Sequence, residues 1–290
     1  MSQDKFSAVW VSHSSISDYL KCPRCYYLKN VYKDPKTGHK INIMNPSMAL
    51  GQAVHEVVEA LSILPTGERF NESLVDKFER VWAKYKGKQG GFWDQKTEDN
   101  FKQRGINMVK RVQSNPGPLK NRAVKINMDL PNFWLSEEDG IILCGKIDWL
   151  EYLEEIDSVH VIDFKTSKSE EDSESLQLPI YHLLVKFCQK RDVVKASYWY
   201  LDYSDALTPK ELPDIDESME KVLQVARRIK LARKLEKYDC GKGPESCHFC
   251  RDYEKILRGE AEFIGVNDFK NDVYILKVDS QLDQDDSYIL

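Results

Sequence analysis

The 290-residue sequence lacks a long apolar segment. No run approaches the roughly 18 apolar residues that a membrane-spanning helix needs. The first residues, Met-Ser-Gln-Asp-Lys-Phe, also lack the apolar stretch of a secretory signal peptide. These absences predict a cytoplasmic protein that does not act in a membrane. In that compartment the seven cysteines are expected to stay reduced.

An excess of positive charge is also missing, because 42 Lys and Arg residues stand against 47 Asp and Glu residues and the formal net charge is −5. A strongly basic chain would indicate binding to nucleic acid directly, so any phosphate-binding surface here must be local. The sequence contains no Gly-x-x-x-x-Gly-Lys-Ser/Thr motif, which excludes a nucleotide-driven motor of that type from this chain.

Hydrophobic periodicity and turn residues predict helices before and after a group of strands. Helices are expected at about 15–28, 47–62, 71–86, 95–113, 177–190 and 214–237. Strands are expected at 123–130, 141–152, 158–165, 196–203 and 273–276. A capping box of Ser15 and Asp18 would open the first helix.

These elements predict an α/β fold with a small mixed β-sheet flanked by helices, in a single domain spanning residues 1–290. Its expected parts are an N-terminal helical part (12–120), a central sheet (121–205) and a C-terminal helix with a cysteine cluster (206–290).

Two neighbouring strands are expected to carry two carboxylates side by side. If residues 154–157 form the turn, Asp148 lies opposite Asp163, and Lys146 lies opposite Lys165. Cross-strand neighbours are about 5 Å apart at Cβ, so like charges placed there repel. Both faces of the strand pair are otherwise largely apolar, which indicates a sheet covered by helices on each side. Buried charges need a partner, and the spacing leaves a metal site and a buried ion-pair network equally open.

Several short motifs occur in a characteristic order. They are Ser12–Tyr27 with its Cys22-Pro-Arg, then Gly51-Gln-Ala-Val-His55, Gly145-Lys-Ile-Asp148, Asp163-Phe-Lys165 and Gln177-x-x-x-Tyr181. Each motif alone is weak, but the order resembles that of RecB-like PD-(D/E)XK nucleases. The resemblance covers about residues 12 to 250 and implies a restriction-endonuclease-like core.

The resemblance also implies a bound Mg²⁺ or Mn²⁺, hard cations that prefer oxygen ligands. Four groups would ligate the ion: His55, Asp148, Asp163 and the carbonyl oxygen of Phe164. Lys165 would orient the attacking water and offset negative charge that develops on the phosphate. Gln177 and Tyr181, one helical turn apart, would support Lys165 and the DNA backbone. Taken singly, His55 is better explained as an exposed helix histidine, and the Gln177–Tyr181 pair is an ordinary surface pair.

Three cysteines follow the last long helix in the pattern Cys240-x6-Cys247-x-x-Cys250. Clustered thiols in a reducing compartment indicate a metal centre before disulfides. Several RecB-like nucleases join one N-terminal and three C-terminal cysteines around a [4Fe–4S] cluster, and Cys22 stands where the first of these would.

The spacing of the C-terminal cysteines departs from the commonest one in the group, in which a further cysteine follows the Cys-x-x-Cys pair. Cys240 would have to substitute for it. Zinc therefore remains the alternative, held by four cysteines or by three cysteines and a histidine, with Cys25 and His248 as spare candidates.

The helix expected at 214–237 carries a group of basic residues: Arg227, Arg228, Lys230, Arg233 and Lys234. Arg227, Lys230 and Lys234 share one face, which we expect to line a groove toward Asp163 and to bind DNA. A solvated helix face is the alternative.

The hypothesis that joins these features is a metal-dependent deoxyribonuclease. We expect an exonuclease acting on single strands or ends in DNA repair, recombination or CRISPR adaptation. A separate helicase or a CRISPR-adaptation protein is the candidate protein partner. The alternatives are a non-catalytic DNA-binding scaffold on the same fold and a metal hydrolase of small phosphoesters.

Overall fold

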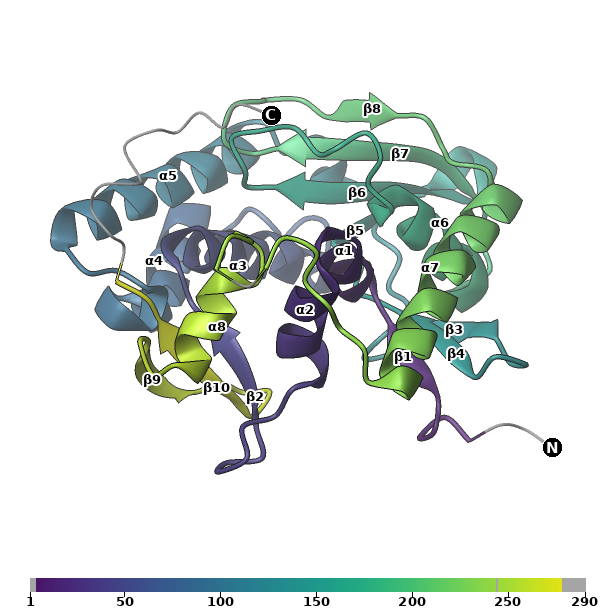
Figure 1. Cartoon of the computed structure of the whole chain (residues 1–290). Helices are drawn as coiled ribbons and strands as arrows, with labels where there is room; N and C mark the ends of the chain where they lie inside the picture. The colour runs from purple at the N-terminus through teal and green to yellow at the C-terminus, as the bar shows by residue number, and fades with distance from the viewer. Residues whose placement is uncertain (1–3, 244, 278–290) are drawn as a thin grey trace.

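The computed structural model describes residues 4–243 and 245–277. Within these ranges three small sheets are surrounded by helices (Figure 1). The expected α/β architecture with helix-flanked mixed sheets is therefore confirmed, although three sheets stand where one was expected. None of the helices in the described part of the chain is both long and apolar enough to cross a membrane.

The central sheet has four strands in the order β5 (Trp149–Leu153), β6 (Ser158–Lys165), β7 (Val193–Tyr200) and β8 (Thr208–Lys210). β6 is antiparallel to β5 and parallel to β7, and β8 is antiparallel to β7. Parallel neighbours need a crossover connection, and helix α6 (Gln177–Cys188) supplies it between β6 and β7. The sheet is therefore mixed, and β6 lies at its centre.

Helices cover both faces of the central sheet, as the apolar strand pattern predicts. One face packs on α3 (Pro46–Glu59), α4 (Leu74–Trp82) and α5 (Gln95–Ser114), and the other packs on α6 and α7 (Ile215–Leu235) (Figure 1). Alternate residues of β6 serve the two cores, because successive side chains of a strand point to opposite faces. Ile162 and Phe164 enter the first core and Val161 the second. Burying each such side chain contributes about 1.5–3 kcal/mol.

The two other sheets join distant parts of the chain. One has the order β1 (Val9–Val11), β4 (Ile141–Cys144) and β3 (Asn132–Ser136). The other has the order β2 (Lys40–Ile43), β10 (Asn271–Ile275) and β9 (Glu262–Val266). Because β10 pairs in parallel with β2, the C-terminal part of the described chain packs beside its N-terminal part.

The strand expected at 141–152 is divided, which corrects one prediction. β4 ends at Cys144 and β5 begins at Trp149, and the two strands belong to different sheets. At the break the backbone N–H of Gly145 donates to the carbonyl of Pro131 at 3.1 Å. A Cβ on Gly145 would lie 2.9 Å from the side chain of Leu184, so a residue without a side chain suits this passage. Lys146 consequently does not pair with Lys165.

The expected strand at 123–130 is also wrong, since only Ala123 forms a bridge there, to Glu151. The first expected helix is interrupted. α1 (His13–Lys21) ends before an extended Cys22, and α2 (Pro23–Tyr26) begins with the proline that disfavours helical geometry at the preceding residue.

The capping box of α1 likewise differs from the predicted one. It is formed by Ser12 and Ser15. Asp18 is used elsewhere, in an ion pair of 2.5 Å with Lys29.

Candidate active site and metal centre

Every residue predicted for catalysis or for the divalent ion lines one pocket. β6 supplies Asp163, Phe164 and Lys165. Side chains alternate between the two faces of a strand, so Asp163 and Lys165, two residues apart, point to the same face. The other predicted members come from α3, from the residue before β5 and from α6: His55, Asp148, Gln177 and Tyr181.

Lys165 is held by three side chains. Its Nζ lies 3.0 Å from Asp163 Oδ2, donates to Glu171 Oε2 at 2.7 Å, and donates to Gln177 Oε1. Burial alone would lower the pKa of Lys165, but the neighbouring carboxylates of Asp163 and Glu171 raise it above the ordinary value. The ammonium group therefore stays charged and is held in one place.

Gln177 joins the lysine to the carboxylate. Its Oε1 accepts from Lys165, and its Nε2 donates to Asp163 Oδ1 at 2.8 Å and lies 3.2 Å from the hydroxyl of Tyr181. Gln177 and Tyr181 are both buried. The pair is therefore not an ordinary surface pair, but part of the wall of the pocket.

The two aspartates form a buried acidic pair. The Asp148 side chain is only 10% exposed and Asp163 is 2% exposed. Burial raises the pKa of both carboxyl groups, and the charge of Asp163 raises that of Asp148 further. Asp148 lies just outside its strand, yet its Oδ2 accepts a hydrogen bond of 2.8 Å from the backbone N–H of Phe164. The Asp148 side chain thus accepts the hydrogen bond that a backbone carbonyl of a neighbouring strand would otherwise accept. Asp148 therefore lies close to β6, as predicted.

The acidic pair is only partly neutralised. Asp163 Oδ2 is buried and meets the ammonium group of Lys165 at 3.0 Å. Lys165 is shared with Glu171, so the two buried aspartates keep an excess of negative charge. Buried charges are costly unless they are paired, and the site therefore fits a divalent cation.

His55 completes the donor set. Its Nδ1 lies 2.9 Å from Glu59 Oε1 and 3.6 Å from Asp148 Oδ2, so one ligand atom from each of the three residues falls within 4.8 Å of the others. Burial opposes protonation of the ring, but the hydrogen bond to Glu59 and the charge of Asp148 raise the pKa of His55 to about 9. A group of carboxylates with one imidazole and a strand carbonyl suits a hard cation.

Two acidic residues of the site were not predicted as ligands. The i+4 spacing of Glu59 from His55 already put both on one helix face, so that signal was present. Glu171 lies in the loop before α6, where several acidic residues follow one another, and no spacing distinguishes it.

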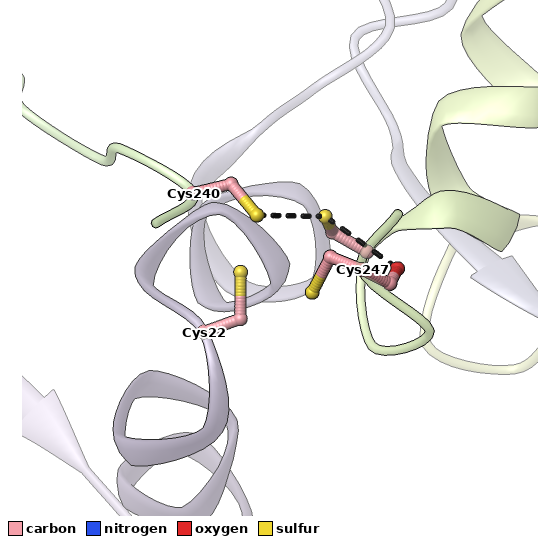
Figure 2. Close-up of side chains that lie close together, drawn as sticks. Cys22, Cys240 and Cys247 are labelled. Carbon is pink, nitrogen blue, oxygen red and sulfur yellow. Dashed lines mark hydrogen bonds between the residues drawn. The ribbon is translucent and has the colours of Figure 1, made fainter. Parts of the chain in front are cut away.

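Four cysteines form a second cluster. One sulfur each from Cys22, Cys240, Cys247 and Cys250 lies within 4.8 Å of the others. In Figure 2 the sulfur atoms of Cys22, Cys240 and Cys247 gather in one space, reached from the start of α2 and from the loop before α8 (Arg251–Leu257). Burial opposes ionisation of Cys247, but the backbone N–H groups of Cys250 and Phe249 lower its pKa to about 7. Cys247 thus favours thiolate, the form that binds metals, whereas burial raises the pKa of Cys22 and of Cys250.

The two spare ligand candidates lie outside this group of four sulfurs. Burial raises the pKa of Cys25 to about 12, which keeps it a thiol. His248 packs instead against the ring of Phe249, with centroids 3.9 Å apart.

The basic face of α7 is not where it was expected. Arg227 Nε lies 2.8 Å from Asp139 Oδ2, and Lys230 donates to the Asp139 carbonyl, in the turn between β3 and β4. Neither of them, nor the exposed Lys234, is among the described residues that line the pocket of Asp163. The expected groove toward Asp163 is therefore misplaced, because the β3–β4 turn engages two of the three cations.

Comparison with known proteins identifies a family. A search of curated proteins found no significant match. The family model described as the PD-(D/E)XK nuclease superfamily matches residues 10–253. That range includes every residue of the pocket and all four clustered cysteines. The match spans most of the sequence, and the chain therefore belongs to the PD-(D/E)XK nuclease superfamily.

Proposed function

We propose that this superfamily member is a RecB-like, Mg²⁺- or Mn²⁺-dependent deoxyribonuclease. The observation that carries the proposal is the buried pair of Asp148 and Asp163 beside a lysine that is held charged. A non-catalytic DNA-binding scaffold on the same fold would not need both the acidic pair and the lysine. The ion would be held by His55, Asp148, Asp163 and the Phe164 carbonyl, and Glu59 joins this set as a ligand or as the partner of His55.

When bound, the ion supplies Lewis-acid polarisation of the scissile phosphate and lowers the pKa of a water molecule. The chain supplies orientation and charge. Lys165 presents an ammonium group that can donate to the attacking water and can stabilise the negative charge that develops on the phosphate oxygens. Gln177 fixes the distance between that ammonium group and Asp163, and Tyr181 supports Gln177 in this position.

The shape around the pocket supports a polymeric substrate. A second hollow shares His55 with the pocket and extends along the β9–β10 hairpin, and a third shares Asp148 and extends past Pro131. Such continuous surface depressions suit an extended strand better than a small phosphoester. We propose single-stranded DNA or DNA ends as substrates, and a role in repair, recombination or CRISPR adaptation, which the motif order suggests.

Incubation of the protein with labelled single- and double-stranded DNA, with and without Mn²⁺, tests this function. Asp163→Ala and Lys165→Ala should each abolish cleavage, and only Asp163→Ala should also weaken metal binding. Lys186→Ala, which removes an exposed lysine of α6 paired with Asp192, is the matched control and should cut normally. Cleavage that survives in either active-site variant would show that another site does the chemistry.

We further propose that the four cysteines hold one metal centre. The motif order favours a [4Fe–4S] cluster. The spacing of 3.7 Å between the sulfurs of Cys240 and Cys250 favours zinc, since two thiolates on one tetrahedral zinc ion lie about 3.8 Å apart. Brown protein with iron and sulfide after purification without oxygen supports the cluster. Colourless protein with one equivalent of zinc supports the alternative, and protein with neither metal refutes the centre.

A further inference from the structure

A hollow of about 350 Å³ lies where four distant segments meet. β1 and the start of α1 form one wall, and the chain from the π-helix η1 (Tyr27–Val31) to the first residue of β2 forms another. Cys144 of β4 and the last turn of α7 complete the hollow. Three cations line it: Lys33, Lys40 and Arg233. No aspartate or glutamate occurs among its lining residues in the described chain. This is an unbalanced group of positive charges in a protein with a net charge of −5.

The three cations have no carboxylate partner within residues 4–243 and 245–277. Other cations nearby are neutralised, as Lys29 is by Asp18 and Arg227 is by Asp139. Burial and then the charges of Arg233 and Lys33 lower the pKa of Lys40. The cations are thus close enough to repel one another, and an anion in the hollow would relieve that repulsion.

The hollow also offers groups that suit a nucleotide. Trp10 lines it with 36% of its surface exposed, and Tyr26 and Asn30 are also among its lining residues. Aromatic side chains beside a positive groove are the usual combination for binding single strands, because bases stack while cations meet the backbone.

The first turn of α1 connects this hollow with the active site. Ser12 lines the hollow. His13, the next residue, has its Nε2 3.5 Å from Ser175 Oγ, just before α6. Burial lowers the pKa of His13 to about 4, and the charges of Glu171 and Lys165 also act on it. The hollow and the catalytic pocket therefore lie on either side of one helix start.

We propose that Lys33, Lys40 and Arg233 bind backbone phosphates of the same nucleic-acid strand that the active site cleaves. The inference rests on the proposed function and assigns the path of the strand: it runs from the pocket past the start of α1 into the hollow. It also replaces Arg227 and Lys230 as the main phosphate contacts of α7, because Asp139 engages those two.

The test compares two triple variants in an Asp163→Ala background, where DNA is bound but not cut. One removes the hollow cations (Lys33→Ala, Lys40→Ala, Arg233→Ala). The matched control also removes three positive charges, all from residues of α7 that do not line the hollow (Arg227→Ala, Lys230→Ala, Lys234→Ala). Affinity for a labelled single strand is measured by fluorescence anisotropy across a salt series.

Each phosphate contact to a single strand contributes about 0.7 to the slope of log affinity against log salt. The hollow variant should therefore bind several-fold more weakly with a slope shallower by about 2, and the control should change much less. An equal effect of both triples, or no effect of the hollow triple, overturns the proposed path. If the hollow triple unfolds, Lys33→Glu alone, at an exposed position, must still weaken binding.

Two further measurements separate this inference from the nuclease assignment and from a free anion. With Asp163 intact, the hollow triple should hydrolyse bis(p-nitrophenyl) phosphate with Mn²⁺ at the wild-type rate. If the wild type does not hydrolyse it or DNA, the nuclease assignment fails whatever the binding data show. If inorganic phosphate stabilises the wild type but not the hollow triple, and DNA affinity is the same in both, the hollow is a site for free phosphate and the strand path is wrong.

Discussion

Replacing Gln177 by leucine tests whether Lys165, the proposed catalytic lysine, acts because it is held in place. The two side chains have similar size, so the substitution keeps the packing of α6 while it removes the polar bridge between Lys165 and Asp163. Two hydrogen bonds to charged groups are lost, each worth about 1.5–3 kcal/mol. Asp163 Oδ1 would also be left buried without a donor, which destabilises the fold by about 1–3 kcal/mol.

The effect on catalysis is smaller than the sum of these bonds, because Glu171 still holds Lys165 at 2.7 Å. A loss of about 1.4–2.7 kcal/mol in transition-state stabilisation lowers the rate of the chemical step about 10- to 100-fold. Single-turnover cleavage of labelled DNA at saturating Mn²⁺ measures that step, and KM for DNA should change little. Tyr181→Phe leaves the bridge of Gln177 between Lys165 and Asp163 in place while it loses the contact of 3.2 Å to Gln177, and it should reduce the rate less. A Gln177→Leu variant with the wild-type single-turnover rate would refute the positioning role.

Three other outcomes follow from the structure. Cys22→Ser, or prolonged chelation, should release the proposed metal of the cysteine cluster and lower the melting temperature, which metal analysis and calorimetry measure together. Unchanged metal content in Cys22→Ser would contradict the four-cysteine centre. Gly105→Ala should destabilise the protein by about 1–3 kcal/mol, since the new Cβ would lie 2.2 Å from the buried ring of Phe78; denaturant unfolding measures this. Burial alone would raise the pKa of Glu151, but hydrogen bonds from His160 and Asn121 lower it. The ionised Glu151 therefore stabilises the fold at pH values above its ordinary pKa of 4.5, and this stabilisation is lost as the pH falls. Glu151→Gln should therefore flatten the acid side of a plot of melting temperature against pH, and an unaltered profile would exclude this contribution.

The sequence predicts best where function depends on short spacings. His55 with Glu59, Asp163 with Lys165, and Gln177 with the tyrosine four residues later each lie on one face of one element, so periodicity alone brings the members of each pair together. The register of β5 and β6 followed from the turn between them, and Trp149 does pair with Ile162 as expected.

Features set by tertiary contacts could not be predicted in this way. The strand-like pattern from Ile141 to Tyr152 does not show that the chain changes sheets at Gly145. The helical periodicity of α7 was right, but it cannot show that Asp139 engages Arg227 while Arg233 faces a hollow. Lys33, Lys40 and Arg233 come together only because β2 and α7 pack near α1, and no motif spans that separation.

The closure of the chain by β2 with β10 and by the cysteine cluster has a consequence for biosynthesis. Cys22 and β2 are synthesised early. Cys22 can join the cysteine cluster, and β2 can pair with β10, only after the C-terminal part of the chain has been synthesised. Contacts between such remote positions form slowly, because the intervening loop must first be ordered. The central sheet with α3, α4 and α5 can assemble during translation, whereas insertion of the proposed metal at the cysteines would come last. Availability of the metal would then control how much newly made protein reaches its finished state.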